Sequence, residues 1–185
     1  MRKNFGAKPM LYPMPVLILG TYDDQGHPNA MNAAWGGISE ADEISICVSE
    51  DHKTTQNFLH THAFTVSIPD VSQMVAADYV GIATGSREPD KIRKCGWTPE
   101  KSSFVNAPIF QELSFALECE VKSYDPESCR LVGRIVNVCA DESILTDGKI
   151  DLSKFHPLTF DPCNHTYVAL GDVVGKAFSD GKKLK

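Results

Sequence analysis

Two short stretches of the sequence carry side chains that could bind a ligand. The first, "HPNAMNAAWGG", places Asn29 and Asn32 among small residues that β-strands normally avoid. Small side chains let a flat ring approach the backbone, whose N–H and C=O groups could then bond to it directly. The two amides could bind the polar edge of such a ring, and Trp35 could pack beside it. The alternative is a close-packed strand crossing with nothing bound, which composition alone favours.

The second stretch, "SEDHKTTQNF", ends a predicted strand and opens a short predicted helix. A helix N-terminus offers free N–H groups and a partial positive charge, which suit a phosphate. Lys53 adds a full positive charge, and Ser49, Thr54 and Thr55 add hydroxyl donors. The alternative is a surface helix with a solvated lysine. Because this stretch follows the first by about one strand, the two ends of one ligand could meet both.

Other chemistry finds little support in the sequence. There is no glycine-rich dinucleotide fingerprint, no phosphate-loop lysine motif, no G-x-S-x-G elbow and no convincing nucleophile–base pair. His52, His60 and His62 lie close in sequence, but no carboxylate or cysteine completes a metal set, so we predict no metal site. A catalytic residue cannot be assigned, and an enzyme of this kind would need a cofactor to carry the chemistry.

The elements that must position these residues are mostly strands. Alternating or continuous apolar residues predict strands at 15–23, 43–50, 63–69, 113–124, 129–140 and 167–175. In the strand at 113–124, Glu118 belongs to a polar face opposite an apolar one. Short helices are predicted at 51–62, capped by an Asp or Thr, and at 71–84 and 88–97. Many short antiparallel strands with few helices predict a mainly β protein, a small barrel forming a single domain over residues 1–185.

Composition narrows the class of protein further. The 185 residues carry a net charge of −6 with a pI near 5.5, which argues against a nucleic-acid or anionic-membrane partner. No run approaches the roughly 20 apolar residues that span a membrane. The N-terminal residues do not make a convincing signal peptide. The six cysteines contain no C-x-x-C pair and are expected to be reduced, buried thiols. These features predict a soluble, cytoplasmic protein.

The order and spacing of several segments resemble the flavin reductase-like group of FMN-binding split barrels, which includes flavoredoxins. The matching segments include "YPMPVLILGT", "GHPNAMNAAWGG", "SEDHKTTQNF", "ADYVGIATGSREPDK" and "CRLVGRIVNV". A flavin has the flat ring and the edge of alternating donors and acceptors that the first stretch could bind. The resemblance implies a six-stranded antiparallel Greek-key split barrel with a few short helices, forming homodimers with FMN near the dimer interface.

The resemblance also implies a set of cofactor-binding residues. The residues expected along the flavin ring and its ribityl chain are Asn29, Met31, Asn32, Ala33, Ala34 and Trp35. Ser49, Lys53 and Thr54 would hold the phosphate. Ser86 and Lys91, in "GSREPDK", resemble a segment that approaches the flavin, either from the same chain or from the partner subunit. The alternative for Lys91 is that it caps its own helix.

The implied function is an FMN-dependent oxidoreductase that transfers electrons from NAD(P)H or another donor. Many flavin reductases have a histidine where "ESCRLVG" has Cys129, and this departure bears on NAD(P)H oxidation more than on flavin binding. The alternative is a non-catalytic electron carrier whose FMN is reduced by a redox protein. A barrel without flavin is the third alternative.

Overall fold

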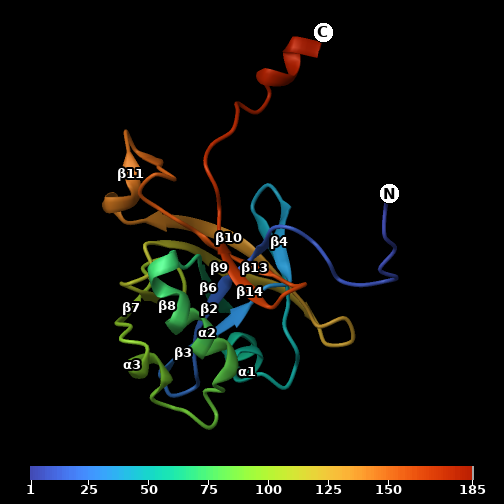
Figure 1. Cartoon of the computed structure of the whole chain (residues 1–185). Coiled ribbons are helices and arrows are strands. Elements are labelled where there is room, and N and C mark those ends of the chain that lie inside the picture. The colour runs from blue at the N-terminus through green and yellow to red at the C-terminus, as the bar shows by residue number, and fades with distance from the viewer. Residues whose placement is uncertain (185) are drawn as a thin grey trace.

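The computed structural model describes residues 1–184, and its centre is a curled antiparallel sheet (Figure 1). Seven strands pair in the order β3-β2-β6-β9-β10-β5-β4. Their bounds are Leu17–Tyr22 (β2), Pro28–Ala33 (β3), Gly36–Glu40 (β4), Glu43–Cys47 (β5), Ala63–Ser67 (β6), Phe115–Asp125 (β9) and Arg130–Ala140 (β10). The predicted mainly β split barrel is confirmed, and its main sheet has one strand more than the resemblance implies.

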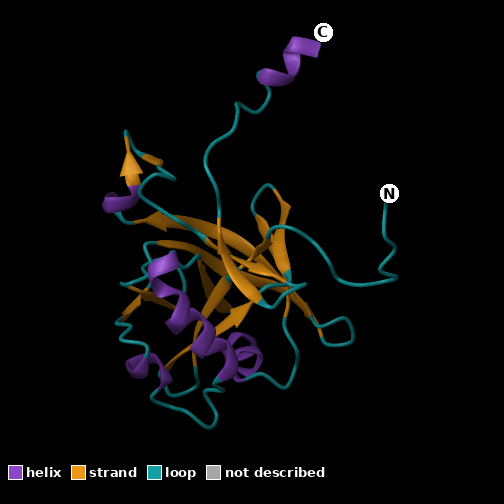
Figure 2. Ribbon diagram, in the orientation of Figure 1, coloured by secondary structure: helices purple, strands orange, loops and turns teal. Residues whose placement is uncertain are grey.

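Smaller sheets and short helices surround this sheet (Figure 2). The smaller sheets are β1-β13-β14, from Met14–Pro15, Leu158–Asp161 and Thr166–Ala169; β7-β8, from Pro99–Lys101 and Pro108–Phe110; and β11-β12, from Leu145–Thr146 and Lys149–Ile150. The helices are Lys53–Thr61 (α1), Met74–Ile82 (α2) and Lys91–Lys94 (α3), with 3₁₀ turns at Val71–Gln73, Glu142–Ile144 and Asp180–Leu184. No helix in the described part of the chain is long and apolar enough to cross a membrane.

The core lies inside the curl of the sheet. Alternate residues of its strands point inward, as period-two patterning requires. The buried cluster consists of Leu17, Leu19, Ala33, Ile44, Ile46, Val48, Phe58, Phe64, Val66, Leu117, Cys119 and Leu131. Gly133 of β10 is needed here, because a Cβ at this position would overlap the Phe64 ring. Phe58 fastens α1 to the core, with its ring 5.3 Å from Tyr124 in an edge-on arrangement.

The stretch from Asn29 to Ser39 forms two strands rather than one. β3 and β4 lie at opposite edges of the seven-stranded sheet, and only Ala34 and Trp35 connect them. A Cβ on Gly36 would lie 3.0 Å from both Leu17 Cδ1 of β2 and Ile46 Cγ1 of β5. Glycine therefore lets the two ends of the sheet approach each other. Around Gly36, the strands therefore cross in close contact.

Glu118 and most of the cysteines lie in surroundings that differ from those that the sequence predicts. Glu118 is buried rather than part of a solvated polar face, because the segment around β7 and β8 covers this side of the sheet. Its carboxylate accepts hydrogen bonds from Ser102 Oγ and from Asn137 Nδ2, the latter at 2.6 Å. All six cysteines are free, but only Cys119 is buried, and Cys47 and Cys163 are exposed.

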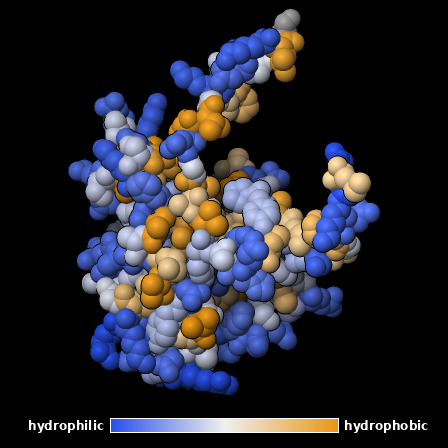
Figure 3. Space-filling view, in the orientation of Figure 1, coloured by the Kyte–Doolittle hydropathy of each residue, from blue (hydrophilic) through white to orange (hydrophobic). Residues whose placement is uncertain are grey.

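The two ends of the chain extend away from the sheet (Figure 1). The strand predicted at 167–175 is shorter than expected, since β14 ends at Ala169 and the following residues leave the body of the protein. Figure 3 shows apolar side chains along this C-terminal segment, and Val174 and Phe178 are almost fully exposed.

Candidate functional site

A cavity of about 270 Å³ forms where β3, the first turn of α1 and the end of α2 meet. β3 contributes Asn29, Met31 and Asn32 from the first sequence stretch, and α1 contributes Lys53 and Thr54 from the second. The lining residues are Asn29, Met31, Asn32, His52, Lys53, Thr54, Val80, Gly81, Ile82, Ala83, Thr84, Gly85 and Lys91. The two polar stretches, separated along the chain, thus border one space.

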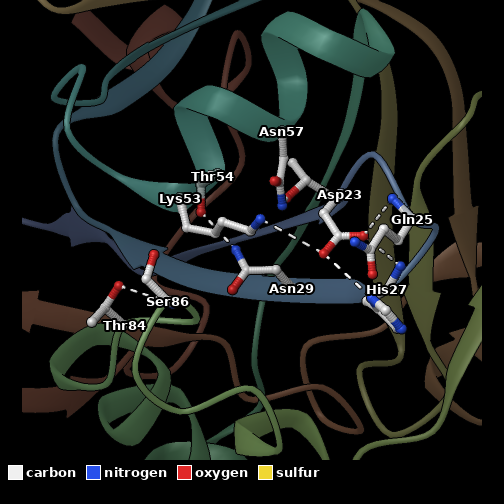
Figure 4. Close-up of polar contacts among 10 residues, drawn as sticks. Asp23, Gln25, His27, Asn29, Lys53, Thr54, Asn57, Thr84 and Ser86 are labelled. Carbon is white, nitrogen blue, oxygen red and sulfur yellow. Dashed lines mark hydrogen bonds and ion pairs between the residues drawn. The ribbon is translucent and has the colours of Figure 1, made fainter.

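Asn29 brings an unsatisfied polar atom to this cavity. Its side chain is only 5% exposed, and its Nδ2 donates to Thr54 Oγ1 at 2.9 Å (Figure 4). Its Oδ1 is buried and has no hydrogen-bond partner among the described residues. Gly85 packs against this oxygen, and any larger residue there would overlap it. A buried carbonyl without a donor costs about 1–3 kcal/mol, so a ligand that supplies a donor would gain from this site.

Asn32 is held differently. Its Nδ2 donates to the backbone carbonyl of Ala77 at 3.0 Å, which ties β3 to α2. The side chain still borders the cavity, beside Gly81 of α2, where a Cβ would lie 3.1 Å from the Asn32 Cβ. Asn32 therefore both positions the helix and presents a polar edge.

The charges around the cavity are positive. Among the described residues its charged lining side chains are Lys53 and Lys91, with no aspartate or glutamate. The N-terminus of α1 adds a partial positive charge. The N-cap residue is His52, with no side-chain hydrogen bond to the helix end, so the predicted Asp or Thr cap is wrong. In a chain of net charge −6, this cavity is suited to an anion.

The two lysines differ in their surroundings. The Lys53 side chain is 27% exposed, and its Nζ lies 3.6 Å from Asp23 Oδ2. Figure 4 shows it reaching from the start of α1 across β3 towards Asp23. Lys91 is only 3% exposed, and its Nζ donates to the Ala83 carbonyl at 2.8 Å. Burial lowers the pKa of Lys91 from 10.5 to about 8.

This shift predicts a pH dependence of stability. Between pH 8 and 10.5 the unfolded chain holds a proton on Lys91 that the folded chain has released, so Lys91 makes the free energy of unfolding rise with pH. Below pH 8 both states are protonated and its contribution is constant. Urea unfolding measures this effect. From about pH 7.5 to about pH 9.5, the free energy of unfolding of wild type should rise relative to that of Lys91→Met. Equal changes in the two proteins would contradict the assignment.

The remaining predicted residues lie around this cavity rather than in its lining. Ala33 is buried in the core beside it, and Ala34 is half-buried. Trp35 is 56% exposed and borders a separate surface hollow with Cys47 and Arg130. Within one chain, Trp35 is therefore not a wall of the cavity.

Ser49 and Ser86 stand at the ends of the site. The backbone carbonyl of Ser49 accepts a hydrogen bond from Thr55 Oγ1 at 2.6 Å, which fixes the start of α1. Ser86 is exposed, and its N–H donates to Thr84 Oγ1 at 3.4 Å, beside the lysine-bearing side of the cavity (Figure 4).

Sequence reasoning missed two parts of the site. The segment 80–84 is predicted only as a helix end, and nothing in its sequence indicates that it lines a cavity. Asp23, at the end of the strand predicted at 15–23, holds the following turn by accepting from Gln25 N at 3.0 Å and His27 N at 2.8 Å. Its pairing with Lys53 depends on the fold, and no motif predicts it.

A second, larger cavity of about 610 Å³ adjoins the first. The two share Asn29, Lys53, Gly85 and Lys91. The charged lining side chains of the second cavity are balanced, with three acids (Asp23, Glu88 and Asp90) and three bases (Lys53, Lys91 and Arg93). Its chemistry therefore differs from that of the first cavity.

Comparison with known proteins gives consistent matches. The family model described as "Flavin reductase like domain" matches residues 10–162. The flavoredoxin of Desulfovibrio vulgaris (Miyazaki F) is 36% identical with a TM-score of 0.94, over 98% of this chain and 100% of that one. A flavoredoxin from Methanosarcina acetivorans is 25% identical with a TM-score of 0.90, over the whole of both chains. The FMN-binding protein from Thermus thermophilus, 21% identical, shares the fold with a TM-score of 0.77 over 95% of this chain and 99% of that one.

Proposed function

This chain belongs to the flavin reductase like domain family, and we propose that it is an FMN-dependent oxidoreductase passing electrons from NAD(P)H or another donor through the flavin. One observation carries the proposal. The cavity between β3 and α1 holds two lysines, no acid among its described lining residues, and a buried Asn29 oxygen that lacks a donor. A ligand with an anionic end and hydrogen-bond donors meets all three requirements.

FMN fits these residues. Lys53, Thr54 and the N-terminus of α1, with Ser49 behind it, would hold the phosphate. Asn29 Oδ1 would accept from a donor of the ligand, and Met31 would pack along it. Bound there, the flavin ring supplies the hydride and electron chemistry that the protein's own side chains lack.

The chain's own residues bind and orient this group. Lys91 is fixed by its bond to the Ala83 carbonyl, so its charge stays at the cavity. Asn32 fixes α2 against β3 and so sets the width of the cavity. Asp23 holds Lys53 by an ion pair, with 3.6 Å between Lys53 Nζ and Asp23 Oδ2 (Figure 4). We propose that these contacts pre-organise the site before the flavin enters.

The proposal includes a homodimer with the flavin near its interface. Trp35, beside edge strand β4, and Ile38, within it, are exposed apolar side chains that a second copy would cover. In such a dimer Trp35, Ala34 and Ser86 would reach the flavin from surfaces that a single chain leaves open.

A stopped-flow experiment tests the electron donor. Anaerobic mixing of the flavin-loaded protein with excess NADPH or NADH should bleach the flavin absorbance rapidly, because hydride transfer reduces the ring. The control is sodium dithionite, which reduces any bound flavin. If the purified protein is colourless, and if adding it to FMN leaves the FMN fluorescence unchanged, the chain does not bind FMN and the proposed function is wrong.

A second function is favoured by one residue. Cys129 is half-buried and at φ +54° in the turn between β9 and β10, at the position where the resemblance to flavin reductases implies a histidine. A chain without that histidine could instead carry electrons from a partner protein. Reduction by dithionite without bleaching by NADPH or NADH would support this carrier and contradict NAD(P)H oxidation.

A further inference from the structure

A third cavity, of about 650 Å³, is lined by residues of β7, β8, β9 and β10 and of the loops beside them. It shares no lining residue with the two cavities described above. We propose that this β7–β8 cavity binds a small organic ammonium ion, with the buried carboxylate of Glu118 as counter-ion and apolar side chains around the hydrocarbon part. The inference goes beyond the proposed function and does not depend on it, because no predicted flavin-binding residue takes part.

Glu118 of β9 places a carboxylate in the wall of this cavity, although the residue is only 1% exposed. Its Oε1 accepts from Asn137 Nδ2 at 2.6 Å, and its Oε2 accepts from Ser102 Oγ. Ser102 Oγ itself accepts from the N–H groups of Phe104 and Val105, both at 2.9 Å, so its own proton is directed to Glu118. Both carboxylate oxygens therefore act as acceptors, as they do in an ionised carboxylate.

No cation of the chain neutralises this carboxylate. Within residues 1–184, no lysine, arginine or histidine forms an ion pair with Glu118. The charged lining side chains described for the cavity are three acids, Glu100, Glu118 and Asp141, and one exposed base, Lys101. A buried charge without an opposite charge is costly, so a ligand that brings a positive charge would gain from this site. An anion would be repelled.

Cys139 of β10 borders the same cavity and does not change this balance. Burial and, next, the negative charge of Glu118 raise the pKa of the Cys139 thiol to about 11. At neutral pH the thiol therefore keeps its proton. It can donate weakly to the carboxylate, but it cannot neutralise it.

The rest of the wall suits a hydrocarbon group. Ile109, Phe110 and Leu113 line the cavity, and Phe104, 61% exposed, borders it from the loop between β7 and β8. The face of an aromatic ring attracts an ammonium group as well as apolar carbon. The volume of about 650 Å³ lies within the range of cavities that bury small organic ligands. A bare metal ion fits less well, because the described residues contain no group of three side chains that could hold one.

The test compares two probes of nearly the same shape, 2-phenylethylamine, which is a cation at neutral pH, and 2-phenylethanol, which is neutral. Each is titrated into ¹⁵N-labelled full-length protein and followed by NMR. The amine should shift the amide signals of Phe104 and Val105, whose N–H groups bond to Ser102 beside Glu118. Its dissociation constant should be about 1 mM or lower, and that of the alcohol about tenfold or more higher, because the alcohol lacks the charge.

A variant assigns this difference to one carboxylate. Glu118→Gln keeps the size and shape of the side chain and removes its charge, so it should weaken the amine by about tenfold or more and leave the alcohol unchanged. Glu120→Gln is the matched control, an exposed acid on the same strand outside the cavity, and it should change neither affinity. If Glu118→Gln does not fold, the comparison of amine and alcohol on wild type decides alone.

Three results would overturn the inference. They are wild type that binds the amine no more tightly than the alcohol, amine binding that Glu118→Gln leaves unchanged, and amine-induced shifts that leave Phe104 and Val105 unaffected. None of these results bears on FMN binding, so the proposed function would stand. Equally, a protein that binds the amine at Glu118 but no flavin would refute the proposed function alone.

Discussion

Replacing Lys53 with alanine is expected to weaken FMN binding by about 10- to 100-fold while riboflavin binding changes little. A hydrogen bond to a charged group is worth about 1.5–3 kcal/mol, and each 1.4 kcal/mol is a factor of ten in affinity. Riboflavin lacks the phosphate, so it does not use this interaction. Quenching of flavin fluorescence on titration with wild type and Lys53→Ala measures both affinities.

The matched control is Lys122→Ala. This lysine is more than half exposed on β9, pairs with Glu43, and borders neither cavity. Its removal should leave both flavins unaffected. Because surface charge alone could shift FMN binding, the titrations are repeated at higher salt, where a general charge effect fades. Equal losses of FMN and riboflavin affinity in Lys53→Ala would refute the phosphate assignment.

Replacing Phe58 with alanine should lower the free energy of unfolding by about 3–5 kcal/mol, the range for removing a fully buried aromatic ring. Phe58 packs against Phe64 and Tyr124 and fastens α1 to the sheet. Since α1 also carries Lys53 and Thr54, the same change should weaken FMN binding. Urea unfolding at neutral pH without flavin measures the first effect.

The neighbouring residue provides the control for this change. Leu59 lies on the same helix but is about half exposed, so Leu59→Ala removes little buried surface. We expect it to cost less than about 1 kcal/mol, as surface substitutions usually do. Similar losses in the two variants would mean that α1 is not anchored by Phe58.

The sequence predicts the framework better than the contacts. Strand periodicity places β2, β5, β6, β9 and β10 nearly where they lie, because each has one face in the core. The sequence places the Lys53 stretch about one strand after the Asn29 stretch and predicts that one ligand could meet both, and the two residues do line one cavity. The division of the Asn29–Ser39 stretch between two sheet edges could not be predicted, because it depends on how far the sheet curls.

Contacts between distant segments explain the other differences. Glu118 alternates correctly with its neighbours, yet a segment about 10–20 residues earlier in the chain covers it. Nothing in the sequence around Lys91 indicates that this lysine is buried. Only the fold places it against the Ala83 carbonyl and the cavity. The roles of the predicted flavin-binding residues, a single domain over residues 1–185, the homodimer and the cytoplasmic location stay predictions.

The two-residue connection between β3 and β4 constrains how this chain can vary in length. Ala33 is fixed opposite Leu17, and Gly36 is fixed opposite Ile46, so Ala34 and Trp35 span the gap between two registered strands. An insertion or deletion of one residue here would reverse which side chains of one strand face the core. Length changes among related sequences should therefore fall in outlying turns such as 126–129, and this bridge should keep its two residues.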